Sequence, residues 1–265
     1  IIRFILGFFV MIGALMFLGC PIRMILRLGG GDLNALFGIA GFAGGIGFGT
    51  IFLKRGYSLQ RTYALSKLES AMMPAIQVGL LVLVVTAPAF IFFSQKGPGA
   101  MHAPWLISLA AGLVVGGLSQ FSRLCTVGGF RDLFLFKKSV LIFGYLAVLV
   151  GVFVVNISFG NFHLGFENQP VAHADGLWNF LGMALAGFCS VLLGGCPLRQ
   201  LTMTGEGNSD SAVTVLGLAA GAAFAHNFGL AASGAGPTLN GQIAVGVGFV
   251  AVSYTHLTLP TKRIV

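Results

Sequence analysis

Two four-residue motifs in this chain each combine a thiol with a guanidinium group. Cys20-Pro-Ile-Arg23 lies near the start and Cys196-Pro-Leu-Arg199 near the end. Proline has no amide donor and suits the first turn of a helix, so neighbouring amides stay free to point at a ligand. A neutral thiol can donate a weak S–H hydrogen bond to an anion, whereas a thiolate would repel the anion. This chemistry is compatible with a path for a small anion, along which Arg23 and Arg199 could offset the cost of dehydrating it.

A third segment, from Ser119 to Asp132, is also dense in polar residues. It follows an apolar run and carries Arg123, Cys125 and a pair of glycines, but it lacks the Cys-Pro signature. Its polarity makes it a further part of the expected path. The candidate path residues are thus Cys20, Cys125, Cys196, Arg23, Arg199 and Arg123.

The other polar residues have less specific explanations. We interpret Cys189 as a packing residue, because it has no counterpart in the first motif region. The arginines, Arg27 included, could instead cap broken helices or reach an interface. The carboxylates are expected to brace loops or to pair with these arginines, and they are Asp32, Glu206 and Asp210.

No cofactor or metal is expected from the remaining motifs. His226 is interpreted as a hydrogen-bonded packing residue of a helix rather than a proton relay, and three other histidines are expected in solvated loops: His102, His163 and His173. No metal-ligand spacing, Cys-x-x-Cys pair or phosphate loop occurs in the sequence. We therefore predict that the chain is not an enzyme.

The two motifs belong to a longer duplication. Positions on either side of each motif match without a gap, so a unit of helix, Cys-bearing break and second helix occurs twice, at about residues 1–53 and 176–233. The matching positions of the first copy are Gly19, Cys20, Pro21, Arg23, Gly29, Gly31, Gly41, Ala43, Gly45 and Phe48. Those of the second copy are Gly195, Cys196, Pro197, Arg199, Gly205, Gly207, Gly217, Ala219, Gly221 and Phe224.

Composition places these units in a membrane. Only 8% of the residues are charged, far below the roughly 25% typical of soluble domains. Apolar runs approach the roughly 20 residues that a bilayer requires, and they lie at 1–20, 33–53, 71–93, 105–121, 139–157, 176–195, 212–233 and 241–253. We predict an all-α integral membrane protein with about eight transmembrane helices or half-helices. The pairs Gly41-x-x-x-Gly45 and Gly217-x-x-x-Gly221 are expected to be close helix contacts.

The placement of charge indicates how the copies are oriented. The net charge is +8, but its Lys and Arg residues cluster in the loops near 54–67 and 131–138, whereas 158–175 and 234–240 contain none. Under the positive-inside rule the first pair of loops is cytoplasmic and the second is external. The copies then have opposite orientations and form inverted pseudo-two-fold repeats. The charge pattern argues for a membrane and not for nucleic acid as the partner.

Inverted repeats place equivalent segments near the middle of the bilayer, as in many transporters. The stretches 20–32 and 196–211 are rich in glycine and polar residues. We expect irregular, re-entrant backbone there, which is tolerated at that depth only inside protein or along a polar cavity. The two Cys-Pro-x-Arg breaks should therefore meet.

These residues resemble the YeeE/YedE sulfur-transport family. The resemblance rests on Gly-Cys-Pro-Ile-Arg-Met with Gly30-Gly31-Asp32-Leu33-Asn34, on Arg123-Leu-Cys125 with Phe130-Arg131-Asp132, and on Gly194-Gly195-Cys196-Pro197 with Gly205-Glu206-Gly207. It covers nearly all of the chain to about residue 252. Within the family the sequence is similar to the branch described as selenium transporters. Other members look like thiosulfate importers whose essential cysteines line a central path, and the resemblance carries that role to Cys20, Cys125 and Cys196 only.

The resemblance implies a multi-pass transporter of the bacterial plasma (inner) membrane. The expected substrate is a small inorganic sulfur or selenium anion, and a cytoplasmic sulfur or selenium carrier protein is a candidate partner. A thiosulfate importer is the alternative within the family. A membrane thiol-redox enzyme and a passive channel for a small solute are alternatives from other classes.

The ends of the chain differ from its middle. It begins inside an apolar run without Met, which suggests that residues before the first helix are missing. We expect a single transmembrane domain at 1–252. Residues 253–265 are expected to be an atypical tail, such as a scar, that interrupts the last helix.

Overall fold

The regular structure of the described chain is entirely helical. The computed structural model describes residues 1–59, 67–88, 90 and 103–258, so Arg61 and His102 lie outside the described residues. Eleven helices follow one another within these ranges, without a β-strand. They are α1 (Ile2–Phe17), α2 (Pro21–Gly29), α3 (Asn34–Lys54), α4 (Lys67–Thr86), α5 (Trp105–Ser122), α6 (Thr126–Phe136), α7 (Val140–Ser158), α8 (Gly176–Leu193), α9 (Pro197–Gly205), α10 (Ser209–Asn227) and α11 (Leu239–Thr258). The all-α prediction is confirmed.

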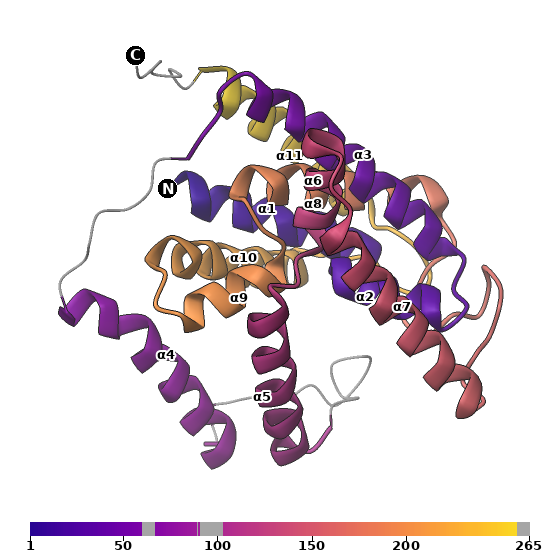
Figure 1. The fold of residues 1–265 in the computed structure, drawn as a ribbon, viewed down its shortest axis with the longest axis horizontal. Helices are drawn as coiled ribbons and strands as arrows, with labels where there is room; N and C mark the ends of the chain where they lie inside the picture. The colour runs from indigo at the N-terminus through magenta and orange to yellow at the C-terminus, as the bar shows by residue number, and fades with distance from the viewer. Residues whose placement is uncertain (60–66, 89, 91–102, 259–265) are drawn as a thin grey trace.

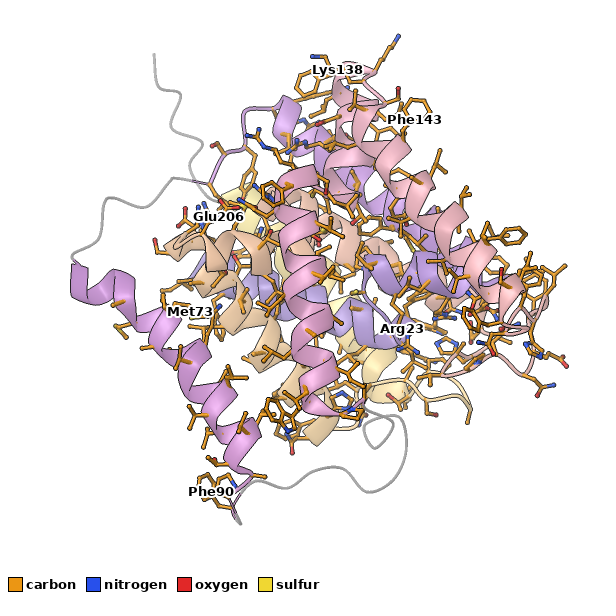
Figure 2. All side chains as sticks on the ribbon, turned by 60° about the horizontal axis from the view of Figure 1, so that its bottom comes forward. Arg23, Met73, Phe90, Lys138, Phe143 and Glu206 are labelled. Atoms are coloured by element: carbon orange, nitrogen blue, oxygen red, sulfur yellow. The ribbon has the colours of Figure 1, made fainter. Side chains whose placement is uncertain are left out.

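Several helices have the length and composition of membrane spans. Five helical stretches qualify among the described residues: Ile2–Gly29, Asn34–Lys54, Trp105–Phe136, Val140–Ser158 and Gly176–Gly205. Large apolar side chains on α5 and α7 face outward, with Leu113 70% and Phe143 63% exposed (Figure 2). Such outward apolar surfaces are expected where helices contact lipid. The chain is a multi-pass membrane protein.

The Cys-bearing stretches contain more helix than we expected. The sequence predicted irregular backbone over 20–32 and 196–211, but α2 and α9 occupy most of these stretches. Pro21 and Pro197 stand in the first turn of their helices, where a missing amide costs nothing. Leu, Ile, Met and Arg then favour continued helix. The interruptions are limited to a few residues before each proline and to the short turns at 30–33 and 206–208.

The two duplicated units pack against each other rather than separately. The main contacts join α3 with α8, α1 with α10 and α1 with α8 (Figure 1). A Cβ atom at Gly41 of α3 would collide with the carbonyl oxygen of Phe180 in α8. A Cβ atom at Gly217 of α10 would collide with the carbonyl oxygen of Phe4 in α1.

These glycine contacts are reciprocal between the copies. Phe4 matches Phe180 in the duplication, just as Gly41 matches Gly217. The second pair repeats the arrangement, because Gly45 abuts the Ala184 carbonyl and Gly221 abuts the Phe8 carbonyl. Each copy therefore contributes its second long helix to the first helix of the other, and the predicted small-residue contacts are confirmed.

The segment after α7 covers the turn between α2 and α3. The amide of Leu33 donates to the carbonyl of Gly165 at 3.0 Å, and the amide of His163 donates to the carbonyl of Gly30 at 2.9 Å. Gly31 has φ +100°, and a Cβ there would collide with the His163 carbonyl, so only glycine fits this crossing. The start of α3 and the end of α7 thus meet at one place.

The periphery differs from the sequence prediction in one respect. Helix α11 continues to Thr258, past residue 253 where we predicted an interruption. The residues Ser253-Tyr-Thr-His-Leu-Thr contain neither Gly nor Pro, so no helix breaker stands there. Helix α4 stands apart from the main group of helices in Figure 1, and it reaches the others chiefly through α10.

Candidate functional site: three cysteine-capped helix breaks

The three candidate cysteines occupy the same position in three similar helix breaks. Helices α1, α5 and α8 each end at a residue of left-handed backbone conformation, with φ 62° at Leu18, 51° at Arg123 and 83° at Gly194. Two residues later a cysteine forms the N-cap of the next short helix. The left-handed residue stops one helix, and the cysteine starts the next.

Hydrogen bonds repeat in the same register at the three breaks. The amide of the residue before each Cys donates to the carbonyl five residues back, at 2.8 Å for Gly19, 3.3 Å for Leu124 and 3.1 Å for Gly195. Each Cys carbonyl accepts the amide four residues on, at 3.0 Å in all three cases. The third break therefore adopts the architecture of the Cys-Pro breaks without a proline. Each thiol lies at the N-terminal end of a helix, where the peptide dipoles favour negative charge.

Cys125 and Cys196 come together in the interior. Their thiols lie within interaction distance of each other, and the side chains are buried, with residue exposures of 7% and 1%. The Cys125 sulfur accepts from the amide of Gly128 at 3.3 Å. The Cys196 sulfur interacts with the amides of Arg199 and Thr126. Both cysteines are free thiols.

Cys20 and Cys196 share a tyrosine in their surroundings. Cys20 is half-buried, and the hydroxyl of Tyr145 in α7 lies within electrostatic range of both Cys20 and Cys196. Tyr145 is itself 6% exposed. Sequence reasoning missed Tyr145 and Thr126, because neither belongs to a Cys motif, although Thr126 follows directly after Cys125.

The two motif arginines fold back over their own breaks. A Cβ atom at Gly19 would approach the Arg23 side chain to 2.7 Å, and one at Gly195 would approach the Arg199 side chain to 3.3 Å. The Nε of Arg23 is buried without a hydrogen-bond partner among the described residues. In the view of Figure 2 the label of Arg23 lies among the helices, whereas Lys138 lies at the top edge of the molecule. The glycine before Cys20 and the glycine before Cys196 thus leave room for the aliphatic part of the arginine side chain.

Arg199 connects the second motif to the third break. One of its guanidinium nitrogens donates to Oε1 of Gln120 at 3.1 Å and lies 3.4 Å from Oε1 of Glu206. This confirms the expected pairing of Glu206 with a motif arginine. Arg123, in contrast, is exposed at the end of α5. Its backbone terminates that helix, so its position does not bring its side chain into the buried cluster.

Arg27 braces the first break from within. Its Nε donates to Oδ2 of Asp32 at 2.6 Å, and its Nη1 donates to the carbonyl of Phe17 at 2.5 Å. The guanidinium carbon lies 4.0 Å from the centroid of the Phe17 ring. Asp32 in turn accepts from the amide and side chain of Asn34, each at 2.9 Å. This group ties the end of α1 to the α2–α3 turn and confirms the bracing interpretation of Asp32.

The remaining polar residues confirm some of the predictions from the sequence and contradict others. Cys189 is fully buried within α8, as expected of a packing residue. Asp210 pairs with Arg3 at 3.0 Å rather than with a motif arginine. His173 was wrongly predicted to be solvated: it is 3% exposed, and its Nε2 lies 2.8 Å from the Met16 carbonyl. His226 was wrongly predicted to pack, because it is exposed in the last turn of α10.

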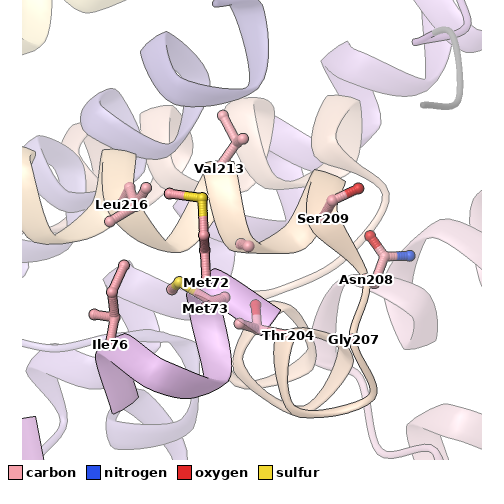
Figure 3. A pocket seen from close by; sticks show the side chains of 10 residues that line it. Met72, Met73, Ile76, Thr204, Gly207, Asn208, Ser209, Val213 and Leu216 are labelled. Carbon is pink, nitrogen blue, oxygen red and sulfur yellow. The ribbon is translucent and has the colours of Figure 1, made fainter. Parts of the chain in front are cut away.

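A pocket of about 250 Å³ lies away from the cysteines. It opens between α4 and the α9–α10 turn (Figure 3), with Met72, Met73 and Ile76 on one side and Val213 and Leu216 on the other. No Cys, Arg or Lys lines it. An apolar pocket without cationic groups does not suit a small anion, so the cysteine cluster is the better candidate site. Among the described residues, no group of three or more His, Cys, Asp or Glu could hold a metal ion.

Comparison with known protein families gives one match. A family model described as sulphur transport matches residues 121–255, which is slightly more than half of the 265-residue chain. The matched range contains Cys125, Cys196, Thr126 and Tyr145. A comparison with curated proteins found no match.

Proposed function

The chain belongs to the sulphur transport family, and from that membership we propose that it imports a small selenium- or sulfur-containing anion. Its family and its apolar helices make it a multi-pass membrane transporter with a sulfur-related substrate. The finer proposal is that the anion passes along Cys20, Cys125 and Cys196. A selenium oxyanion is the first candidate and thiosulfate the alternative. The proposed location is the bacterial plasma membrane, where lipid surrounds the bundle of helices.

The proximity of two buried thiols carries this proposal. Cys125 and Cys196 start different short helices, yet their thiols lie within interaction range of each other. A thiol donates a weak hydrogen bond and its sulfur is polarizable, which suits a soft atom of sulfur or selenium. Two helix N-terminal ends point toward the same spot and offset the cost of dehydrating an anion. Weak donors hold such an anion loosely enough for it to move on.

An inverted pseudo-two-fold repeat is the proposed framework. The reciprocal glycine contacts support it, because a two-fold exchange converts the Gly41–Phe180 contact into the Gly217–Phe4 contact. The three matching breaks would then be re-entrant segments that approach the bilayer midplane. The charge distribution supports the orientation: Lys54 ends α3 and Lys138 precedes α7, both at the helix ends remote from the 30–33/163–165 junction.

Other classes of function are less well supported. A membrane thiol oxidoreductase would need a redox partner for the Cys125–Cys196 pair, and the family describes transport. A passive channel for a neutral solute would have no use for the motif arginines beside the breaks. A cytoplasmic sulfur or selenium carrier protein would be a suitable recipient of the substrate at the inner face.

Uptake into vesicles tests the proposal. The purified complete protein would be reconstituted into liposomes, and uptake of labelled selenite, thiosulfate and sulfate would be measured over a concentration series. We expect saturable uptake of selenite or thiosulfate and little uptake of sulfate, which lacks a soft atom. Uptake that rises linearly with concentration would indicate a channel. Absence of uptake of all three anions would contradict the proposal.

A further inference from the structure

Two buried hydroxyl groups beside the thiol cluster have no well-formed hydrogen bond among the described residues. They are Oη of Tyr145 and Oγ1 of Thr126, on residues that are 6% and 1% exposed. The Thr126 hydroxyl faces the Cys196 sulfur, which is only a weak acceptor. Leaving a buried hydroxyl without a partner destabilises the folded protein. A group kept at that cost requires an explanation.

The two buried hydroxyls come from different helices in the neighbourhood of the same thiol. Thr126 is the first residue of α6, and its amide also interacts with the Cys196 sulfur. Tyr145 lies in α7, within electrostatic range of Cys196 and Cys20. The N-cap thiols of α6 and α9 complete this group. Donor groups of α6, α7 and α9 therefore lie in one neighbourhood, around the Cys196 thiol.

The tyrosine ring is fixed by aromatic neighbours. Its centroid lies 5.9 Å from that of Phe130 in a T-shaped arrangement, and Phe130 makes a similar contact with Phe42 at 6.0 Å. Edge-to-face contacts of this kind restrict the ring without using its hydroxyl. The hydroxyl is thus held in place without a hydrogen-bond partner in the described part of the chain, as a preorganised donor would be.

We propose that Tyr145 and Thr126 bind the oxygen atoms of the transported anion and so select oxyanions. This inference rests on the proposed function and extends it to substrate selection. The thiols suit the soft sulfur or selenium atom, whereas the two hydroxyls are stronger donors that suit oxygen. An anion without oxygen, such as hydrosulfide, leaves both hydroxyls unpaired. A binding site that forms hydrogen bonds with a polar group of its ligand rejects analogues that lack this group.

Conservative variants separate this role from packing. Tyr145→Phe and Thr126→Val keep size while removing the hydroxyl, and Thr126→Ser restores it. Tyr57→Phe is the matched control, because Tyr57 is another shielded tyrosine, near Cys189 and Arg3 rather than near the three path cysteines. The readouts are KM for labelled thiosulfate and selenite, inhibition of that uptake by unlabelled hydrosulfide, and thermal stability in detergent.

We expect KM for the oxyanion to rise about tenfold in Tyr145→Phe and Thr126→Val, which corresponds to about 1.4 kcal/mol. Inhibition by hydrosulfide should stay within about twofold of the parent, because it does not use the hydroxyls. Thr126→Ser and Tyr57→Phe should resemble the parent. Unchanged KM in both hydroxyl-deleted variants, with uptake still dependent on Cys196, would overturn this inference alone. A parent that transports no oxyanion, or does so without need of Cys196, would contradict the proposed function as well.

Discussion

The thiol of Cys125 at the start of α6 lies within interaction range of the thiol of Cys196 at the start of α9. One belongs to the break without proline and the other to the second Cys-Pro motif, so separate sequence motifs form one buried site. An anion held by one sulfur would already be within reach of the other. Cys20, at the start of α2, lies within electrostatic range of the same Tyr145 hydroxyl as Cys196.

Removing the path thiols should stop transport without unfolding the protein. We expect Cys20→Ala, Cys125→Ala and Cys196→Ala each to lower the rate of vesicle uptake by about tenfold or more, the scale of about 1.4 kcal/mol per lost interaction. Thermal stability in detergent should change little, because each side chain is small. The measurement pairs initial uptake rates with unfolding curves for the same preparations.

Two controls sharpen the cysteine experiment. Serine keeps a donor of similar size but is harder than sulfur, so serine at the three positions should also transport poorly. Cys189→Ala removes a thiol that is buried in α8 outside the breaks, and its uptake should be near the parental rate. Parental uptake by all three path alanine variants would mean that the cysteines only pack.

Mild oxidation should join Cys125 to Cys196. Two thiols in contact can form a disulfide if their backbones allow the required geometry, with diamide accepting the two electrons and two protons. After this treatment we expect the two thiols no longer to react with alkylating reagents and the protein no longer to take up the anion. A reducing dithiol should restore both the thiol reactivity and the uptake. The cross-link is identified by mass spectrometry of peptides. A Cys125→Ser variant cannot form this disulfide, so diamide should leave its residual uptake unchanged. Formation of a disulfide that includes Cys189 would contradict the pairing of Cys125 with Cys196.

The helices could be predicted from the sequence because apolar runs and glycine pairs are local patterns. Each of the eight predicted runs contains one long helix, and Gly41 and Gly217 lie at the expected close contacts. The duplication also predicted the breaks at Cys20 and Cys196. The third break was found from polarity alone, but its identical backbone register was not predicted, because Arg123 is not a residue type that usually adopts a left-handed conformation.

Long-range pairing was harder to predict than local structure. Tyr145 lies in the middle of an apolar helix, and nothing in the neighbouring sequence indicates that its hydroxyl lies within electrostatic range of two cysteines. His173 stands in a polar loop, yet tertiary packing buries it against the end of α1. These positions depend on how distant helices cross, which periodicity does not encode.

Alanine at the reciprocal glycines should destabilise the protein by similar amounts. A methyl group at Gly41 or Gly217 would collide with a backbone carbonyl, and overpacking of this kind costs about 1–3 kcal/mol. Gly44→Ala is the control in the same helix, because a Cβ there would lie 3.8 Å from the Phe180 ring in ordinary contact. Thermal unfolding in detergent measures the effect. Equal stability of the Gly41→Ala and Gly44→Ala variants would contradict the close packing of α3 and α8.

The arginines of the first break should separate into a transport role and a structural role. Arg27 is buried, paired with Asp32 at 2.6 Å and stacked on Phe17, and breaking a buried pair costs about 3–5 kcal/mol. We therefore expect Arg27→Gln and Asp32→Asn to lower the unfolding temperature strongly. Combining them should cost less than the sum of the two, because the first change already breaks the pair.

Arg23→Gln should behave in the opposite way. Its Nε is buried beside the Cys20 break without a partner among the described residues, so its removal leaves no other charge uncompensated. We expect the change in stability to stay within about 0.5 kcal/mol, while KM for the anion rises about tenfold through loss of the nearby positive charge. Arg199→Gln should raise KM similarly, with a small further loss of stability because it also contacts Gln120 of α5. Uptake kinetics and unfolding are measured on the same samples. If Arg23→Gln unfolds the protein as readily as Arg27→Gln, Arg23 is a structural brace and the attraction of the anion must come from the helix ends alone.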